Sequence, residues 1–167
     1  MTKNIVLIGL MGSGKTTIGK KIAEKLKMKF IDTDELIVQK AQKAINLIFA
    51  EDGELFFRDL ESEVIEEISK QENIVISTGG GAVLREENLN NLKKNGVLFY
   101  LFATAEELFE RIKDDTERPL INTESPIETL KIIQARREIF YNQADFKIIT
   151  SEKTPDETAD EIINLFV

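Results

Sequence analysis

Two residue types that often carry enzyme chemistry are missing from this chain of 167 residues. There is no cysteine, which excludes a disulfide scaffold, a zinc site built on thiolates and a cysteine nucleophile. There is no histidine either, so any general base must be a carboxylate or, less often, a lysine. With 42% hydrophobic residues, the chain is otherwise typical of one globular domain with a sizeable core.

Basic clusters and long apolar runs are also missing. Lys and Arg number 22 against 30 Asp and Glu, and no basic run is longer than a pair. Nucleic acid and anionic membranes repel such a chain, so we expect neither as a partner. The longest apolar stretches, 5–11 and 97–103, are too short to span a bilayer. The first of them runs into a polar loop where a signal peptide would have its cleavage region, so we expect a cytoplasmic protein.

Short apolar runs alternate with longer amphipathic segments. The short runs, which predict strands, lie at 5–8, 30–31, 74–76, 97–102 and 146–149. Apolar residues at helical spacing predict helices over 15–27 and 54–69. This alternation predicts an α/β fold, with a parallel sheet covered by helices on both faces, in a single domain over 1–167.

Several helix ends are marked in the sequence. Thr104, Ser125 and Thr154 each stand three residues before a glutamate, which is the pattern of a capping box. In two of them proline follows directly, at the first helical position. The pair Asn95-Gly96 predicts the end of the helix before the fourth strand.

The segment Gly9–Thr16 matches the phosphate-loop pattern G-x-x-x-x-G-K-[ST]. Its glycines let successive N–H groups form one anion-binding nest, and the helix that follows points its positive end at the phosphates. Lys15 would reach the β- and γ-phosphates, and Thr16 would ligate Mg²⁺. The alternative is a glycine-rich turn without chemistry, but the strand before the motif and the helix after it favour ATP and Mg²⁺. The expected nucleotide-binding residues here are Gly12, Ser13, Gly14, Lys15, Thr16 and Thr17.

Two carboxylates, Asp32 and Asp34, follow the second predicted strand. Ligands bind beyond the carboxyl ends of parallel strands, so we expect both side chains beside the phosphate loop. Residues i and i+2 at a strand end point the same way, so both would face the cleft. One carboxylate would help to hold Mg²⁺ and the other would accept a hydroxyl proton. The alternative is that Asp32 or Thr33 only caps the next helix.

A kinase is favoured over a GTPase switch. The chain has no guanine-reading N-K-x-D and no D-x-x-G. It does have a polar stretch, about 114–124, and a loop of that length is usually a functional lid or a disordered segment. Small size, a candidate lid and a carboxylate pair indicate phosphoryl transfer to a small molecule.

Taken in order, the motifs resemble those of the shikimate kinase family, from Gly9 to about Phe146. The matching elements are Gly9–Thr16, Phe30–Asp34, Ile48-Phe49, Gly53–Glu61, Ser77–Gly81, Arg118–Leu120, and Arg137 with Tyr141. The resemblance implies transfer of the ATP γ-phosphate to the 3-hydroxyl of shikimate, a step towards aromatic amino acids. It also implies a monomer with a nucleoside-monophosphate-kinase-like fold and a five-stranded parallel sheet of order 2-3-1-4-5.

The resemblance also implies residue roles. Asp34 meets the reacting hydroxyl, Arg58 and Arg137 hold the substrate carboxylate, and Gly80 contacts the substrate. Arg118, in the candidate lid, contacts ATP. Arg111, just before the lid, lies by the adenine. We thus expect catalysis from Asp34, Lys15 and Arg118, and a metal site at Thr16 and Asp32. Guanidinium forks suit a planar carboxylate, and a glycine turn lets a polyol approach the backbone.

Plainer alternatives stay open. Arg58 could simply pair with Glu61 on its own helix, and Arg136 and Arg137 could form a solvated face. Ile139 stands where the family usually has proline, so either arginine could be the one that points inward. We expect Phe49 and Phe57 to be core residues. The competing enzyme is a gluconate-type sugar kinase, which would share the phosphate loop but lack the paired arginines with the Gly-Gly-Gly turn. The competing class is a non-catalytic nucleotide-binding module, and the intact Lys15, Thr16, Asp32 and Asp34 count against it.

Overall fold

The computed structural model describes residues 3–115 and 122–167. Its centre is a five-stranded sheet of order β2-β3-β1-β4-β5 in which every pairing is parallel. The strands are β1 (Asn4–Ile8), β2 (Lys29–Asp32), β3 (Ile74–Ser77), β4 (Gly96–Phe102) and β5 (Phe146–Ile149). The predicted α/β fold and strand order are confirmed.

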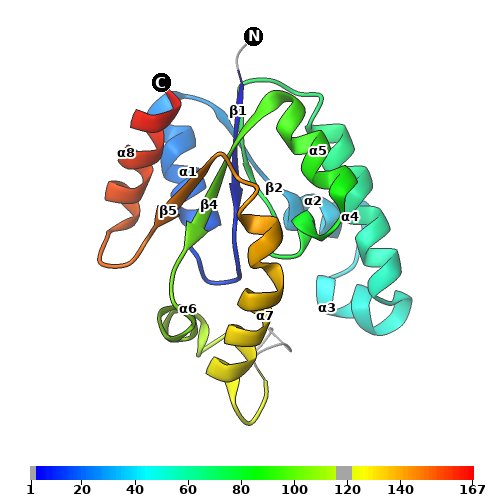
Figure 1. The fold of residues 1–167 in the computed structure, drawn as a ribbon. Helices are drawn as coiled ribbons and strands as arrows, with labels where there is room; N and C mark the ends of the chain where they lie inside the picture. The colour runs from blue at the N-terminus through cyan, green and yellow to red at the C-terminus, as the bar shows by residue number, and fades with distance from the viewer. Residues whose placement is uncertain (1–2, 116–121) are drawn as a thin grey trace.

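Helices cover both faces of the sheet (Figure 1). Early in the chain come α1 (Lys15–Leu26), α2 (Thr33–Ala41), α3 (Ile45–Leu47), the π-helical η1 (Ile48–Asp52) and α4 (Glu54–Ile68). After β3 come the 3-10 turn η2 (Ala82–Leu84), α5 (Glu86–Asn95), α6 (Ala105–Ile112), α7 (Pro126–Tyr141) and α8 (Pro155–Phe166). No helix in the described part of the chain is long and apolar enough to cross a bilayer.

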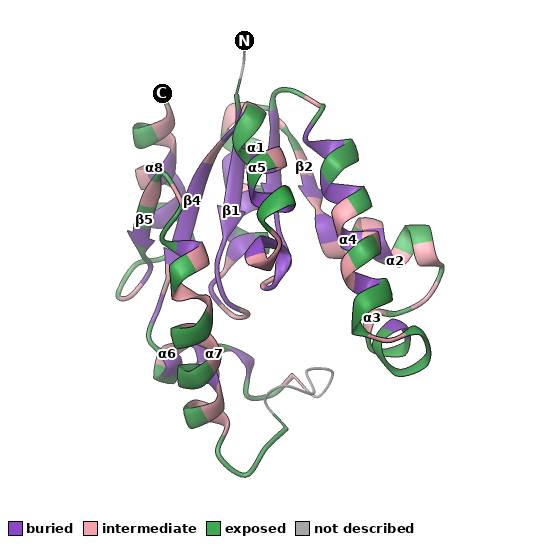
Figure 2. Cartoon of the chain, turned by 45° about the vertical axis from the view of Figure 1, so that its right-hand side comes forward, coloured by how far each residue is buried: buried purple, intermediate pink, exposed green. Residues whose placement is uncertain are grey.

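The central strand β1 explains how the two layers form. Its side chains alternate: Ile5 and Leu7 pack towards α1 and α8, whereas Val6 and Ile8 pack towards α4, α5 and α7. All four are fully buried, which is why this strand is apolar without polar alternation. Figure 2 shows the strands as the most buried part of the molecule, with exposed residues on the outer helix faces.

Two of the three predicted capping boxes are confirmed, at Thr104 and Thr154. The box predicted at Ser125 is wrong, because the Ser125 side chain makes no capping hydrogen bond to α7. Its backbone has ψ 72°, whereas ψ is 157° at Thr104 and 159° at Thr154. Without that extended geometry the hydroxyl is not aimed at the first turn of the helix. Pro126 still occupies the first turn of α7, as predicted.

The predicted end of α5 is in the right place, but Gly96 is there for a different reason. It is not a left-handed cap: with φ −126° and ψ 152° it is extended and begins β4. A β-carbon at this position would lie 2.6 Å from the Leu92 carbonyl oxygen and 2.7 Å from Val6 Cγ2. Gly96 is therefore required for close packing of α5 on the sheet.

Candidate active site

The phosphate loop leaves the sheet at the carboxyl end of β1 and leads straight into α1. Gly12 has φ 79° and Gly14, the residue that caps α1, has φ 93°. Side chains rarely adopt this left-handed region, and a β-carbon on Gly12 would also lie 2.8 Å from Ile112 Cγ2. The backbone path of the loop therefore requires glycine at these motif positions. A strand precedes the loop and a helix follows it, as in a phosphate-binding loop, so the alternative of a glycine-rich turn without chemistry is disfavoured.

Lys15 is folded over its own loop. Its ammonium donates to the carbonyl oxygens of Gly9 at 2.6 Å and Leu10 at 3.1 Å, and to Ser13 Oγ at 3.4 Å. The side chain is only 9% exposed. A positive charge is therefore held at the floor of the loop.

Asp32 serves two neighbours at once. Its Oδ1 accepts from the backbone N–H of Asp34 at 2.9 Å and of Glu35 at 3.3 Å, which caps α2. Its Oδ2 accepts from the Thr16 hydroxyl at 3.0 Å. The capping alternative is thus real, and it coexists with the expected place beside the phosphate loop.

The route that brings Asp34 to the site differs from the prediction. Thr33 and Asp34 already belong to α2, so the two carboxylates are not related by strand alternation. Asp34 reaches the site from the first turn of the helix, while Asp32 ends the strand. Both line the same cavity, as expected, but the geometric reason given from the sequence is wrong.

This cavity has a volume of about 490 Å³. The expected residues that line it are Gly12, Ser13, Gly14, Lys15, Thr16, Thr17, Asp32, Asp34, Gly80 and Arg111. The Arg111 guanidinium donates to the Gly12 carbonyl oxygen at 3.2 Å and to Thr150 Oγ1 at 3.3 Å. Arg111 thus ties the phosphate loop to the segment that follows β5.

Sequence reasoning missed the wall formed by that segment. Thr150, Lys153, Pro155 and Thr158 all line the cavity. A signal was available, because this segment follows the carboxyl end of a predicted parallel strand, where ligands bind. Thr154 and Pro155 were interpreted only as a helix start.

Gly79 and Gly80 also line the cavity; with Gly81 they form a turn that follows β3 after Thr78. A β-carbon on Gly79 would lie 2.8 Å from Asp34 Oδ1 and 3.0 Å from Glu61 Oε2. These carboxylates come from α2 and α4, so the two helices meet at this glycine. A side chain at Gly79 would displace one of them.

The other two glycines contact the arginines. A β-carbon on Gly80 would lie 3.3 Å from Arg137 Nη1, and one on Gly81 would lie 2.5 Å from Arg58 Nη1. The β-carbon on Gly80 would also lie 3.7 Å from the Gly9 carbonyl oxygen. The turn therefore brings guanidinium groups from α4 and α7 close to the phosphate loop.

Arg58 does pair with Glu61, as the plainer alternative had it. The Arg58 Nη1 to Glu61 Oε1 distance is 2.8 Å, and Glu61 is only 1% exposed. Burial raises the pKa of Glu61 above its ordinary value, while the nearby Arg58 charge opposes the rise. Since the guanidinium still abuts Gly81, the ion pair holds Arg58 at the turn.

Three further expectations concern α7, the aromatic residues and the lid. On α7 Arg136 is exposed, whereas the half-buried Arg137 faces Gly80.

Phe57 is a core residue, but Phe49 is 38% exposed, so its predicted burial is wrong. Its ring lies at the protein surface, packed on Phe57 with ring centroids 4.6 Å apart. Arg118 and most of the predicted lid, 114–124, lie outside the described residues.

A phosphate loop that opens a helix, a neighbouring carboxylate pair and two arginines packed against the glycine turn define a P-loop kinase of a small molecule. Comparisons with known proteins make this class specific. The family model for shikimate kinase matches residues 11–166. The shikimate kinase of Caldicellulosiruptor bescii is 48% identical over 98% of this chain and 95% of its own length. The chain belongs to the shikimate kinase family, and it is an ATP-using enzyme.

Solved structures agree with this assignment. A shikimate kinase from Acinetobacter baumannii, in complex with shikimate, superposes with a TM-score of 0.94 at 35% identity, covering 99% of this chain and 93% of that one. A gluconokinase from Sinorhizobium meliloti has a TM-score of 0.65 at 19% identity, covering 98% and 91% of the two chains. The second likeness concerns the fold alone, so it does not favour the sugar-kinase alternative.

Proposed function

We propose that this protein, as a single kinase domain, transfers the γ-phosphate of ATP to the 3-hydroxyl of shikimate. The product would be shikimate 3-phosphate, a step towards aromatic amino acids. One observation carries the proposal: the Gly79–Gly81 turn packs against Arg58, Arg137 and Asp34. The same turn lies beside the phosphate loop. Membership of the family, and the shikimate bound by the Acinetobacter baumannii relative, support the same substrate.

On the acceptor side, Arg58 and Arg137 bind the shikimate carboxylate. Guanidinium groups are planar and always charged, so two of them suit a planar acid better than any sugar hydroxyl. Gly80 lies between this clamp and the phosphate loop, which leaves room for a ring rather than a side chain. The clamp thereby fixes which hydroxyl of the ring faces the γ-phosphate.

On the nucleotide side, the loop from Gly12 to Thr17 binds the phosphates and Lys15 exchanges its loop carbonyls for phosphate oxygens. Arg111, at the cavity wall between Gly12 and Thr150, lies against the adenine. Arg118 is expected to contact ATP as well. A cytoplasmic location and a monomeric state also stay predictions.

Thr16 and Asp32 fit a magnesium site. They bring one hydroxyl and one carboxylate together, and the described residues include no cluster of three or more carboxylates that would cage a metal. Mg²⁺ prefers such sparse protein ligation, completed by waters and substrate phosphates. When bound, the ion neutralises charge on the β- and γ-phosphates.

Asp34 orients the attacking hydroxyl and takes its proton. No histidine is available, and Asp34 lies on the wall that joins the clamp to the phosphate loop. Phosphoryl transfer has a loose transition state, so positioning and charge stabilisation dominate and the proton need not leave early. Lys15 supplies the positive charge on the phosphate side.

The test is release of ADP with Mg²⁺ and a series of acceptors: shikimate, gluconate, AMP, CMP and none. Release should depend on shikimate and be negligible with the other acceptors. Faster turnover with gluconate or a nucleotide would overturn the substrate assignment. No release with any acceptor would favour the nucleotide-binding module.

A further inference from the structure

Tyr141 is a fully buried tyrosine whose hydroxyl reaches the glycine turn. It ends α7, one helical turn beyond Arg137, and is 0% exposed. The hydroxyl donates to the Gly80 carbonyl oxygen at 2.6 Å. Burial raises the pKa of Tyr141, and the adjacent Arg137 guanidinium opposes that rise. The hydroxyl therefore lies between two groups that the proposed function assigns to shikimate, Gly80 and Arg137.

A second buried hydroxyl holds the turn from the opposite side. Thr33, which is 0% exposed, accepts from the backbone N–H of Gly79 at 3.0 Å. Thr33 belongs to α2 and precedes Asp34 in the chain. The two hydroxyls thus join the turn to the helices that carry the base and one arginine of the clamp.

Three consecutive glycines restrain their own backbone weakly, since glycine has the widest backbone freedom of all residues. The turn is closed by a bond from the Ala82 N–H to the Gly79 carbonyl oxygen at 3.1 Å, which leaves the Gly79 N–H and the Gly80 carbonyl oxygen to partners outside the turn. A turn of this kind needs external hydrogen bonds if its atoms are to stay in one geometry. A displacement of about 1 Å in a substrate-positioning group is enough to lower turnover markedly. Bonds to the adjacent residues Gly79 and Gly80 would limit such displacements.

We propose that Tyr141 and Thr33 are positioning residues for the acceptor: their hydroxyls fix the Gly79–Gly81 turn, and through it the alignment of shikimate. This inference rests on the proposed function, because it concerns the acceptor wall. Neither hydroxyl reacts with substrate. Loss of either should therefore affect the kinetic constants for shikimate far more than those for ATP.

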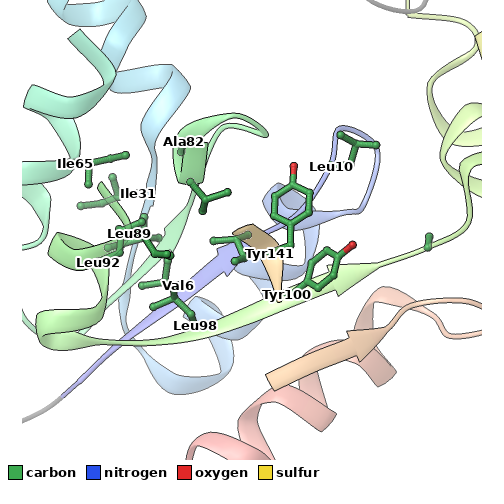
Figure 3. Close-up of a cluster of buried hydrophobic side chains, with 14 of the residues drawn as sticks. Val6, Leu10, Ile31, Ile65, Ala82, Leu89, Leu92, Leu98, Tyr100 and Tyr141 are labelled. Carbon is green, nitrogen blue, oxygen red and sulfur yellow. The ribbon is translucent and has the colours of Figure 1, made fainter. Parts of the chain in front are cut away.

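The first experiment compares Tyr141→Phe with Tyr100→Phe. Tyr100 is the matched control: it stacks on Tyr141 with ring centroids 4.8 Å apart, and its hydroxyl donates to Glu138 rather than to the turn. Figure 3 shows the two rings side by side, with their hydroxyls pointing in different directions. Tyr141→Phe should lower kcat/KM for shikimate about tenfold and leave KM for ATP unchanged. Tyr100→Phe should keep wild-type kinetics.

The second experiment keeps the proposal testable even if Tyr141→Phe folds poorly. Thr33→Val keeps the shape of the side chain but removes the acceptor, and should also lower kcat/KM for shikimate about tenfold. Thr33→Ser restores the hydroxyl and should recover most of the activity. Wild-type kinetics in folded Tyr141→Phe or Thr33→Val would overturn the inference. So would equal losses in Tyr141→Phe and Tyr100→Phe, or in the two Thr33 variants.

These outcomes are separate from the fate of the proposed function. If the wild type releases no ADP with shikimate, the substrate assignment fails, and the inference fails with it. If the wild type is active and the variants match it, only the inference fails.

Discussion

At the scale of single residues, two carboxylates of the site have oxygens with different surroundings. Asp32 caps α2 with one oxygen and meets Thr16 with the other. Glu61 holds Arg58 with Oε1, while its buried Oε2 has no hydrogen-bond partner among the described residues. Such groups link folding to chemistry, so their substitution should affect stability and activity by different amounts.

Asp34 provides the most direct test of the proposed chemistry. Asp34→Asn keeps the size of the side chain but removes the base, so kcat should fall by roughly 10²–10⁴-fold. ATP affinity should persist, because the phosphate loop is unchanged. The measurements are shikimate-dependent ADP release and nucleotide titration. Glu35→Gln, an exposed neighbour in the same helix turn, is the control and should keep wild-type turnover. An active Asp34→Asn enzyme would assign the base elsewhere.

Glu61 should make stability depend on pH. Its pKa is raised in the folded protein, chiefly by burial, above the ordinary value of 4.5. The folded state therefore holds this proton more tightly than the unfolded chain. The resulting stability is fully present below about pH 4.5 and is lost as the pH rises through the folded pKa.

Glu61→Gln removes this titration, so its free energy of unfolding should fall less than that of the wild type between pH 4.5 and 7. Urea is the suitable denaturant, because it does not screen charges as a salt would. Glu63→Gln removes an exposed carboxylate from the same helix and controls for the loss of one negative charge. Identical pH slopes in wild type and Glu61→Gln would contradict the prediction.

At the scale of elements, α7 and α8 have similar start sequences, but only α8 has a side-chain cap. Thr154 accepts from the Glu157 N–H at 3.2 Å, and Glu157 in turn accepts from the Thr154 N–H at 2.7 Å. Thr154→Ala should therefore destabilise the protein by about 1 kcal/mol. Ser125→Ala should cost much less, because that side chain makes no cap. Urea unfolding measures both, and equal losses would show that the two caps do not differ.

Elements that a contiguous pattern encodes were predictable from the sequence. Five strands and the helices α1 and α4 match their apolar patterns, because each buries a continuous face. The π-helical η1 was not predictable. Its bond from the Gly53 N–H to the Ile48 carbonyl oxygen is a five-residue step, which no side-chain pattern encodes. Ile48, the first residue of η1, is fully buried in a cluster with Ile37, Phe57 and Val64 from α2 and α4.

The site shows the same division. The phosphate loop is a local motif, so its residues could be named from sequence alone. The hydroxyl of Tyr141 could not be placed from the sequence, since its partner Gly80 is 61 positions away in the chain. The wall formed by Thr150, Lys153, Pro155 and Thr158 was signalled only by its place after a predicted parallel strand. Physical reasoning did supply the residue types for the clamp, and the family resemblance supplied their partners.

At the scale of the whole molecule, the parallel sheet itself assembles the site. β1 and β3 are neighbours, so the phosphate loop and the glycine turn leave the same edge side by side. Helices α4 and α7 then bring Arg58 and Arg137 to that turn from distant parts of the chain. Only folding brings the two arginines of the proposed clamp together. The effects of substituting Arg58 and Arg137 on shikimate kinetics should therefore depend on each other, although the residues lie on separate helices.

The clamp makes the last prediction. In the proposed function each arginine supplies charge-assisted hydrogen bonds of roughly 1.5–3 kcal/mol to the substrate carboxylate, so Arg58→Ala and Arg137→Ala should each lower kcat/KM for shikimate at least about tenfold. Arg58→Lys should stay impaired, because lysine keeps the charge but loses the fork. The clamp also sets where the hydroxyl meets the γ-phosphate, so kcat should fall as KM rises.

A double-mutant cycle tests whether the two arginines share one ligand. In the Arg58→Ala background, Arg137→Ala should cost less than it does alone, since the carboxylate has already lost its alignment. Arg136→Ala is the matched control: it removes the same charge one residue away on the exposed side of α7, and should leave shikimate kinetics unchanged. Strictly additive losses would mean that the arginines act on separate groups. If both single variants fold and keep wild-type shikimate kinetics, the acceptor is not an acid held by this clamp, and only the assignment as a P-loop kinase stands on the geometry.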